Sequence, residues 1–462
     1  MLNDIITPQA RYFADGMQSV MRGHENRTRR VSLLKGNLVQ NIRTESRGIS
    51  ARVTKNGYYG FSSVASYTEE DARMVLKAAT ENALFLDRKA GKARKGYPAL
   101  PGGTVPVNRL IVDFEQKKII DACKEVDAYI AKTYPDLLSR SVTYTEDSQD
   151  KIILTSDAAS GHVTYPRCYM YIRMTALATL TGSPVEVTEI LGGAGSFEDN
   201  FGDLSPVYPA VDALYLQLMD KKEGVYAEAG NKTVILGGKM SGMLAHEAVG
   251  HTVEADLVMG GSVAGPCLHK QVASELGTLI DYAHTALGET VPLPVYLDDE
   301  GTLAKDAVLI QDGILVGYMN SRESAEYFGM EPCGNARAWD FNDEPLIRMR
   351  NTAILPGKSS LEEMIESIDD GYYLVNTSNG QADVTGEFMF GVSMGYEIKK
   401  GKLGRAILDT TVSGIAFDML KTADMISDTL SWESSGFCGK KQRMPVGLAG
   451  PDIRCKITIG GR

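Results

Sequence analysis

The spacing of two histidines most constrains how this chain can fold. His246 and His251 are two of only six histidines, they lie five residues apart, and Glu247 follows the first directly. Histidine is the most common zinc ligand, and a carboxylate beside a metal-bound water is the usual general base of metal-assisted hydrolysis. The pattern His-Glu-x-x-x-His therefore predicts a metallopeptidase site.

The interval of five residues does not fit a regular α-helix. Each helical residue advances about 100°, so positions i and i+5 lie about 140° apart and cannot share one ion. The two imidazoles can converge only if the helix widens locally, as in a π-bulge, or ends at Gly250. Gly250 permits either arrangement because it carries no Cβ that restricts φ. The sequence therefore predicts a distorted helix at this glycine.

A catalytic zinc needs three protein ligands and an open position for water. The residues alone leave the third ligand open. Local spacing favours Glu254 or Asp256, whereas the preference of zinc for thiolates favours a distant cysteine equally. Among the cysteines, Cys438 has the most site-like setting, because glycines flank it closely and Lys440 and Lys441 favour the thiolate. The full set of candidates is Glu254, Asp256, Cys267, His269, Cys438 and Cys455.

The two acidic candidates have a second interpretation. If they are not ligands, Glu254 and Asp256 are predicted to be carboxylates that orient a metal-binding imidazole rather than charges that face the solvent. Cys455 lies in the strand-like run IRCKITIG and is expected to be a core residue.

The chain of 462 residues is too long for one ordinary core. An α+β fold is predicted in three parts: an N-terminal α+β segment (1–100), a central α+β segment (101–230) and a β-rich catalytic domain (231–462). In the last part, the metal motif is expected on a helix that packs against a large, mainly antiparallel sheet. A stretch rich in Gly, Pro and basic residues, 88–108, is predicted to be a linker.

Several elements carry local signals. Strands are expected over 28–34, 36–43, 49–54 and 58–65, and helices near 112–132 and 209–224. Thr68 is predicted to cap a helix whose first turn is acidic. The buried stripe of that helix is expected to be Ala72, Val75, Leu76, Ala79 and Ala83.

Composition and net charge limit the partners and the location expected for this chain. The net charge of −11 argues against nucleic acid as a partner, because such binders need a basic footprint. No apolar run reaches the ~18 residues of a membrane span, so no membrane association is expected. The N-terminus lacks a signal-like pattern, so a cytoplasmic location is expected. The six cysteines are scattered without Cys-x-x-Cys pairs, which is typical of reduced thiols.

One further motif is typical of serine hydrolases, but the rest of the chain does not fit that class of enzyme. Gly391-Val392-Ser393-Met394-Gly395 fits the G-x-S-x-G elbow of serine hydrolases. That fold places its histidine after the serine, but no histidine follows His284.

Five segments together resemble the TldD/PmbA (TldD/TldE) metallopeptidase family. They are HEAVGHTVEAD, DDEGTLAKDAVLIQDGILVGYMNSRESAEYFG, GNARA, PLIRMRN and SGFCGKKQRMPVGLAG, and the resemblance covers nearly the whole chain. The family pairs a catalytic TldD-type subunit with a homologous subunit that lacks His-Glu-x-x-x-His. This chain keeps the motif and so resembles the catalytic side.

The resemblance implies a site and a mode of action. It implies Zn²⁺ bound by His246, His251 and Cys438, with Glu247 as the general base. It also implies a peptide substrate in unfolded or extended form, and a homodimer or a heterodimer with a TldE-like subunit. The alternative is a partner-binding subunit of such a complex with little or no activity of its own.

The chain departs from the family pattern at two places. Lys441-Gln442-Arg443 stands where Gly-Gln is common, and the run around 334–337 is GNAR rather than a TGN-Arg-Arg type. Neither departure touches a predicted ligand, so both are expected to alter peptide contacts or partner choice.

Overall fold

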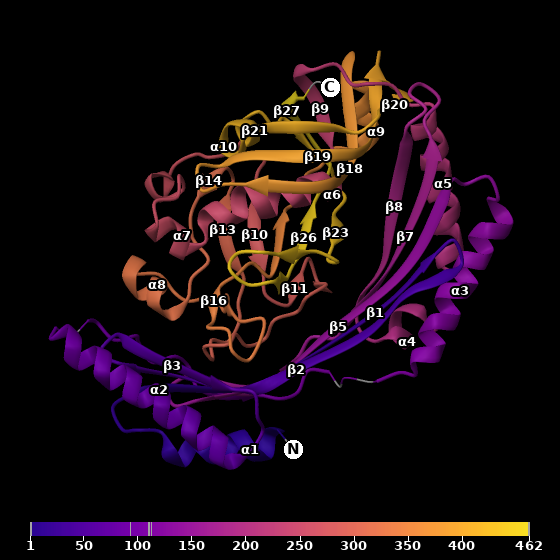
Figure 1. The fold of residues 1–462 in the computed structure, drawn as a ribbon. Coiled ribbons are helices and arrows are strands. Elements are labelled where there is room, and N and C mark those ends of the chain that lie inside the picture. Colours follow the sequence, from indigo (N-terminus) through magenta and orange to yellow (C-terminus); the bar gives the residue numbers. More distant parts are fainter. Residues whose placement is uncertain (1, 93, 110, 112, 461–462) are drawn as a thin grey trace.

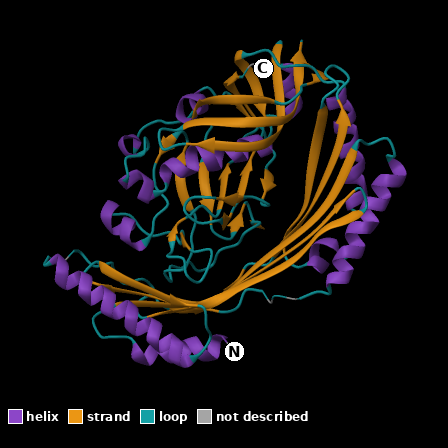
Figure 2. Cartoon of the chain, in the orientation of Figure 1, coloured by secondary structure: helices purple, strands orange, loops and turns teal. Residues whose placement is uncertain are grey.

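The computed structural model describes residues 2–92, 94–109, 111 and 113–460 as two sheet-based parts. A long curved sheet, formed by strands within the first 194 residues, makes a cradle (Figure 1). The strands from residue 230 onward form a second, more compact part on the concave side of that cradle (Figure 2). The mixed α+β class predicted from the sequence is confirmed.

The cradle is built on three long antiparallel strands, β1 (Gln18–Leu34), β2 (Asn37–Lys55) and β5 (Ser139–Thr155). β1 lies between the other two and pairs with both along nearly its whole length. Lys35 and Gly36 connect β1 to β2, and both have positive φ (49° and 82°). Two such residues match the twist of the flanking strands and make a tight hairpin. The strands extend well beyond the predicted ranges.

The cradle sheet has the order β3-β2-β1-β5-β6-β4, and β7 also pairs with β5 and carries β8. Because β1 pairs directly with β5, strands from both sides of residue 100 share one sheet. The predicted division between 1–100 and 101–230 therefore does not separate two sheets. The other strands are β3 (Tyr58–Val64), β4 (Gly103–Val105), β6 (Ala159–Thr164), β7 (Arg167–Leu177) and β8 (Pro184–Ala194).

Helices cover the convex face of the cradle (Figure 1). α2 (Glu69–Ala90) packs on β2 and β3, and the Thr68 side chain accepts a hydrogen bond from the Asp71 N–H, as predicted for its cap. All five residues of the predicted stripe are buried. α3 (Gln116–Thr133) and α5 (Val207–Lys222) cover the other end of the sheet. Shorter helices are α1 (Leu2–Ile6), η1 (Thr7–Tyr12) and α4 (Phe197–Phe201).

The second part contains a seven-stranded sheet in the order β18-β9-β27-β21-β19-β20, with β22 beside β27. An additional pairing of β18 with β19 closes five of these strands into a ring. The strands are β9 (Gly230–Leu236), β18 (Asp370–Ala382), β19 (Glu387–Lys399), β20 (Lys402–Ala406), β21 (Thr410–Ile415), β22 (Met425–Ile426) and β27 (Ile453–Ile459).

A six-stranded sheet in the order β14-β13-β10-β17-β26-β23 completes the second part. Its strands are β10 (Leu279–Tyr282), β13 (Ala307–Gln311), β14 (Ile314–Leu315), β17 (Asn351–Ile354), β23 (Ser431–Glu433) and β26 (Gly447–Gly450). Short ladders join β11 (Thr285–Ala286) to β12 (Glu289–Thr290), β15 (Ala336–Arg337) to β16 (Leu346–Ile347), and β24 (Phe437–Cys438) to β25 (Met444–Pro445). The helices here are α7 (Ala255–Met259), η4 (Gly265–Cys267), α8 (Arg322–Phe328), α9 (Leu361–Glu366) and α10 (Ala416–Lys421).

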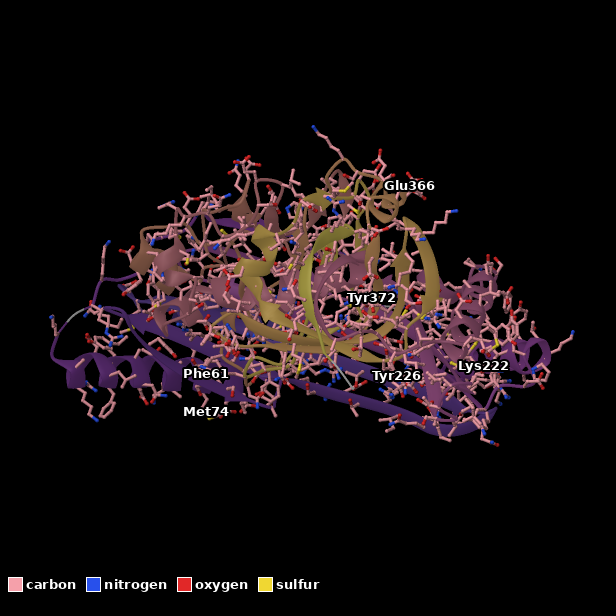
Figure 3. All side chains as sticks on the ribbon, turned by 90° about the horizontal axis from the view of Figure 1, so that it is seen from above. Phe61, Met74, Lys222, Tyr226, Glu366 and Tyr372 are labelled. Carbon is pink, nitrogen blue, oxygen red and sulfur yellow. The ribbon has the colours of Figure 1, made fainter. Side chains whose placement is uncertain are left out.

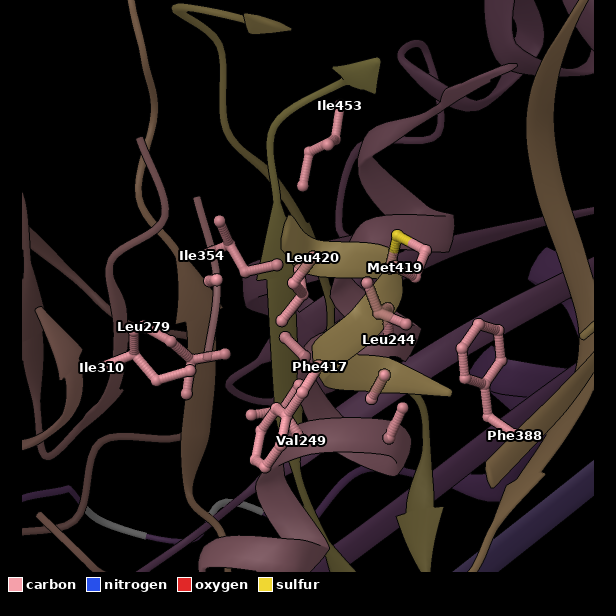
Figure 4. Close-up of a cluster of buried hydrophobic side chains, with 14 of the residues drawn as sticks. Leu244, Val249, Leu279, Ile310, Ile354, Phe388, Phe417, Met419, Leu420 and Ile453 are labelled. Carbon is pink, nitrogen blue, oxygen red and sulfur yellow. The ribbon is translucent and has the colours of Figure 1, made fainter. Parts of the chain in front are cut away.

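The histidine motif lies on a helical segment that contacts both sheets of this part. α6 (Gly238–Met243) leads directly into η2 (Leu244–Gly250), which contacts β17 and β26 of the six-stranded sheet and β18 and β19 of the other. Leu244 and Val249 belong to the largest apolar core, together with Phe417 and Leu420 of α10 and with side chains of both sheets (Figure 4). The helix is therefore held on several sides by buried apolar contacts.

Buried polar groups join the cradle to the second part. Lys151 of β5 donates from Nζ to Asp299 Oδ2 (2.9 Å) and to the carbonyl of Ala338 (2.8 Å). Arg22 of β1 lies 3.4 Å from Asp299 Oδ1, and all three side chains are almost fully buried. Seen from above, the second part lies over the middle of the long sheet of the cradle (Figure 3). Within the described residues, no helix has both the length and the apolar character needed to cross a membrane.

Candidate metal centre

The helix that carries the two histidines is widened, as the spacing predicts. η2 is a π-helix, and the N–H of His251 donates to the carbonyl oxygen of His246, five residues back. In a π-helix this i→i+5 repeat brings residues five apart onto one face. A short 3₁₀ turn, η3 (His251–Val253), follows at once. The two imidazole rings consequently lie 5.2 Å apart, centroid to centroid.

Gly250 is needed for packing rather than for an unusual backbone angle. Its φ is −54°, an ordinary helical value, so the freedom of φ expected from the sequence is not used. A Cβ at this position would lie 2.2 Å from Met349 Sδ and 3.0 Å from the carbonyl oxygen of Ala245. The absence of a side chain lets the widened turn pack against the buried segment that contains Met349.

His246, His251 and Cys438 converge, and their ligand atoms all lie within 4.8 Å of one another. Cys438 lies on β24, and its Sγ is 3.3 Å from His251 Nε2. His246 is buried, and its Nδ1 has no hydrogen-bond partner among the described residues. Two imidazoles and a thiolate are the donor types that zinc prefers, so these residues fit that metal.

The three donors shift the pKa of one another. Burial raises the pKa of the Cys438 thiol, but hydrogen bonds to His246 and His251 outweigh burial and lower it to about 3. Burial lowers the pKa of His251, but hydrogen bonds to Cys438 and Glu254 outweigh that effect and raise it to about 10. The two shifts describe a pair of thiolate and imidazolium, so a metal that binds here finds the thiolate it needs and displaces the proton of His251 from Nε2.

Glu254 contacts the side of the His251 ring that faces away from Cys438. Its Oε2 lies 2.7 Å from His251 Nδ1, so the ring presents Nε2 to Cys438 and to an ion between them. Glu254 is fully buried, and its other oxygen lies 3.1 Å from Lys440 Nζ. Asp256 contacts no imidazole: both of its oxygens accept from Lys440 Nζ at 3.0 Å. The predicted orienting role therefore fits Glu254 directly, whereas Asp256 contacts only the lysine that pairs with Glu254.

Glu247 lies beside the two rings. Its Oε2 is 3.7 Å from His251 Nε2, and its Oε1 is 4.0 Å from His246 Nε2. Its side chain is 23% exposed, whereas that of His246 is 2% exposed. A carboxylate at the edge of the donor set that retains contact with solvent can accept a proton from a bound water.

Arg348 braces the cysteine loop, and sequence reasoning missed it. The fully buried guanidinium donates from Nη2 to the carbonyl of Cys438 (2.8 Å). It also donates from Nη1 to the carbonyls of Gln442 (2.7 Å) and Lys440 (3.1 Å). The run PLIRMRN, noted only as part of the family resemblance, contained this residue.

Among the described residues, the other third-ligand candidates Cys267, His269 and Cys455 do not belong to a metal-compatible group with the histidines. Within the described part of the chain, His246, His251 and Cys438 are the metal-compatible His/Cys/Asp/Glu group. Cys455 is buried on β27 opposite Val234, as expected of a core residue, and Cys267 ends the short helix η4. Ser393 of the G-x-S-x-G decoy lies within strand β19 rather than on a strand-turn-helix elbow.

Comparison with known proteins identifies the family of the chain. Residues 229–461 match the PmbA/TldA metallopeptidase C-terminal domain, and residues 21–83 match PmbA/TldA metallopeptidase domain 1. A protein of Saccharolobus solfataricus named as a zinc metalloprotease TldD homologue is 30% identical over 424 residues, which cover 90% of each chain.

Solved structures share the fold at low identity. A candidate modulator of a DNA gyrase from Thermotoga maritima superposes with a TM-score of 0.78 at 17% identity, and TldE from Thermococcus kodakarensis with 0.72 at 16%. Each comparison covers 99% of both chains.

The fold, the histidine motif and the matched domains together place this chain among the metallopeptidases. More specifically, it belongs to the PmbA/TldD metallopeptidase family, which confirms the resemblance seen in the sequence.

Proposed function

We propose that the protein is a zinc-dependent peptidase that hydrolyses unfolded or extended peptides. The observation that carries this proposal is the convergence of His246, His251 and Cys438 with Glu247 beside them. When bound by these residues, zinc supplies Lewis-acid polarisation of the scissile carbonyl and a water of lowered pKa. The relative named as a zinc metalloprotease supports the choice of metal.

Glu247 is the general base of this mechanism. It accepts a proton from the attacking water and delivers that proton to the leaving amine, which must be protonated to depart. Its partial exposure beside both imidazoles suits a group that must exchange protons with water. Glu254 keeps His251 in the tautomer that leaves Nε2 available.

An extended peptide is the form of substrate that suits the surroundings. A cavity of about 940 Å³ lies on the concave face of the cradle and reaches Phe437, the residue before Cys438. Residues 39–42 of β2 line it at an edge of the sheet, because β3 pairs only with Ile49–Lys55 of that strand. Backbone pairing to such an edge gives affinity with little dependence on side chains. We infer that the peptide enters as a single extended segment.

The proposed assembly is a dimer, either of two copies of this chain or with a TldE-like subunit, and the proposed location is the cytoplasm. The superposition on TldE from Thermococcus kodakarensis supports a shared fold for two such subunits.

A matched pair of cysteine variants tests the metal site. Cys438→Ala is expected to abolish stoichiometric zinc binding, measured by metal analysis after dialysis. Cys455→Ala, which removes an equally buried thiol away from the histidines, is expected to retain it. Equal zinc content in the two variants would remove Cys438 from the site.

Zinc-loaded Glu247→Ala is expected to keep the metal and to lose at least 100-fold in hydrolysis of an unfolded peptide. Unchanged hydrolysis would overturn the role of Glu247.

A further inference from the structure

The cavity beside the metal centre has a polar floor. The concave face of β1, β5 and β7 carries hydroxyl side chains there, whereas the same strands bury apolar residues against the helices on the convex face. The hydroxyls belong to Thr28, Ser32, Thr143, Thr145, Tyr169 and Tyr171. Tyr169 also donates a hydrogen bond (2.8 Å) to the carbonyl of Ser434, which ties this floor to the loop that carries Cys438. A solvated, hydroxyl-rich floor suits a polar ligand.

Arg443 reaches this cavity from the C-terminal loop. Its guanidinium stacks on the ring of Phe437, 3.6 Å from the ring centroid, and lies 5.6 Å from that of Trp339. Stacking on an aromatic face fixes the plane of the guanidinium and leaves its N–H donors free. Within the described residues, Arg443 forms no ion pair with a carboxylate.

Arg30 of β1 lines the same cavity and likewise has no carboxylate partner among the residues described. The acidic groups of the lining are already engaged. Asp147 accepts from Arg167 Nε at 2.7 Å, and Glu146 lies 3.9 Å from Arg29. The cavity therefore carries uncompensated positive charge.

The charges around Arg443 are mixed: Asp147 attracts its guanidinium, whereas Arg167 and Arg30 repel it. Burial lowers the pKa of its guanidinium, Asp147 opposes that effect, and repulsion from Arg167 and Arg30 adds to the lowering. The protein as a whole is acidic, with a net charge of −11. A local basic site within an acidic molecule favours a negatively charged ligand at that place.

The basic site adjoins the segment that carries Cys438. Phe437 lines the cavity and directly precedes Cys438 in β24, and consecutive side chains of a strand point to opposite faces, so the cavity and the proposed metal ligand lie on opposite faces of this short strand. An extended peptide advances ~3.3 Å per residue, so a substrate that passes from the metal site around the strand into the cavity brings a side chain to Arg443 after several residues.

We propose that Arg30 and Arg443 bind carboxylate side chains of the substrate and select peptides with Asp or Glu near the cleavage site. The proposal rests on the proposed peptidase function and names a substrate class for it. Both guanidiniums can form charge-assisted, two-pronged hydrogen bonds to a carboxylate. They are specificity residues and take no part in the bond cleavage itself.

Binding of matched peptides to the zinc-free protein tests the selection directly. The probes are two fluorescent, C-terminally amidated peptides that differ only in Glu against Gln at two central positions. Amidation removes the terminal carboxylate, so only side-chain charge differs. At about 20 mM salt, fluorescence anisotropy is expected to show about tenfold tighter binding of the Glu peptide. Near 500 mM salt the two peptides are expected to bind with nearly equal affinity because the charges are screened.

Arginine variants then identify the site. Arg30→Gln combined with Arg443→Gln is expected to bring the preference below twofold, and Arg443→Lys to keep part of it. The control is Arg405→Gln, which removes an exposed arginine of β20 that pairs with Glu397. It is expected to leave the preference intact. Equal binding of the two peptides by the wild type, or an unchanged preference in the double variant, overturns the proposal.

A parallel assay separates this proposal from the proposed function. The zinc-loaded wild type is expected to cleave the Glu peptide with about tenfold higher kcat/KM than the Gln peptide. If it cleaves neither peptide, the peptidase function fails, whatever the binding preference. If it cleaves both equally and binds both equally, the peptidase function stands and the selection of carboxylates fails.

Discussion

His251 has a separate task for each ring nitrogen. Nε2 faces the thiolate of Cys438, and Nδ1 faces the buried carboxylate of Glu254. Lys440 then compensates the charge of that carboxylate, at 3.1 Å. The orientation of a single imidazole thus depends on a chain of three residues from two distant segments.

Glu254→Gln is therefore expected to weaken zinc affinity about 10- to 100-fold, because the ring loses its charged acceptor. Competition with a chromogenic chelator measures this change. Asp256→Asn is the matched control, since Asp256 contacts Lys440 and no imidazole. Asp256→Asn is expected to weaken zinc affinity by less than about threefold. Equal losses in both variants would show that net negative charge, and not the contact with His251, supports the metal.

At the scale of elements, the π-turn of η2 depends on close packing against Met349. In an ordinary helix, replacing glycine by alanine stabilises by up to about 1 kcal/mol. Here the new methyl group would lie 2.2 Å from Met349 Sδ, so Gly250→Ala is expected to destabilise by about 1–3 kcal/mol. Chemical denaturation, followed by circular dichroism, measures the change.

Whether the effects of Gly250→Ala and Met349→Ala on the free energy of unfolding are additive tests this explanation. Met349→Ala removes the clashing sulfur, so adding Gly250→Ala to that background is expected to cost less than it does in the wild type. Two changes in direct contact are expected to be non-additive in this way. Additive losses would show that the glycine serves the backbone and not the packing.

A helix or strand is predicted well from the sequence when the residues that define it lie close together in the chain. The cap and buried stripe of α2 follow from residues within one helix, and the prediction was complete. The widened turn follows from the spacing of His246 and His251 alone. β2 was predicted as two strands, 36–43 and 49–54, because residues 44–48 (TESRG) between them are polar or glycine and show no apolar alternation.

The candidate site could be predicted only in part from the residues alone, because its groups come from distant parts of the chain. The residues alone left six third-ligand candidates, because Cys438 meets His251 across 187 residues of sequence. Only the family resemblance singled out that cysteine. Arg348 escaped detection because nothing in a short sequence window distinguishes a buried arginine, bonded to backbone carbonyls, from an exposed one.

At the scale of the whole molecule, His24 links stability to pH. It is fully buried on β1, where the cradle meets the second part, and Nε2 lies 2.9 Å from Asn26 Oδ1. Burial lowers its pKa well below 6.5, and the charges of Lys151 and Arg22 add to that lowering, whereas Asp299 opposes it. The folded state therefore keeps this imidazole neutral.

Acidification is expected to destabilise the protein through His24. Below pH 6.5 the unfolded chain protonates this histidine but the folded state does not, so the unfolded state binds more protons and stability falls as pH falls. One such group contributes up to about 1.4 kcal/mol per pH unit. His24→Gln is expected to reduce the drop in thermal midpoint between pH 7.5 and pH 5.5 by a few degrees.

His284→Gln is the control for this titration, because His284 is partly exposed and stacks on Tyr296 away from β1. It is expected to leave the pH dependence unchanged. The same loss of pH dependence in both variants would indicate a general effect of histidine content and not the buried position of His24.

The separation of 187 residues between His251 and Cys438 also sets an order of events during synthesis. Ribosomes add about 5–20 residues per second, so the thiolate emerges roughly 10–40 s after the second histidine. During that interval the nascent chain offers only two of its three proposed zinc ligands. A newly made molecule therefore cannot complete the proposed site until translation has passed residue 438, which delays its competence to cleave neighbouring unfolded chains.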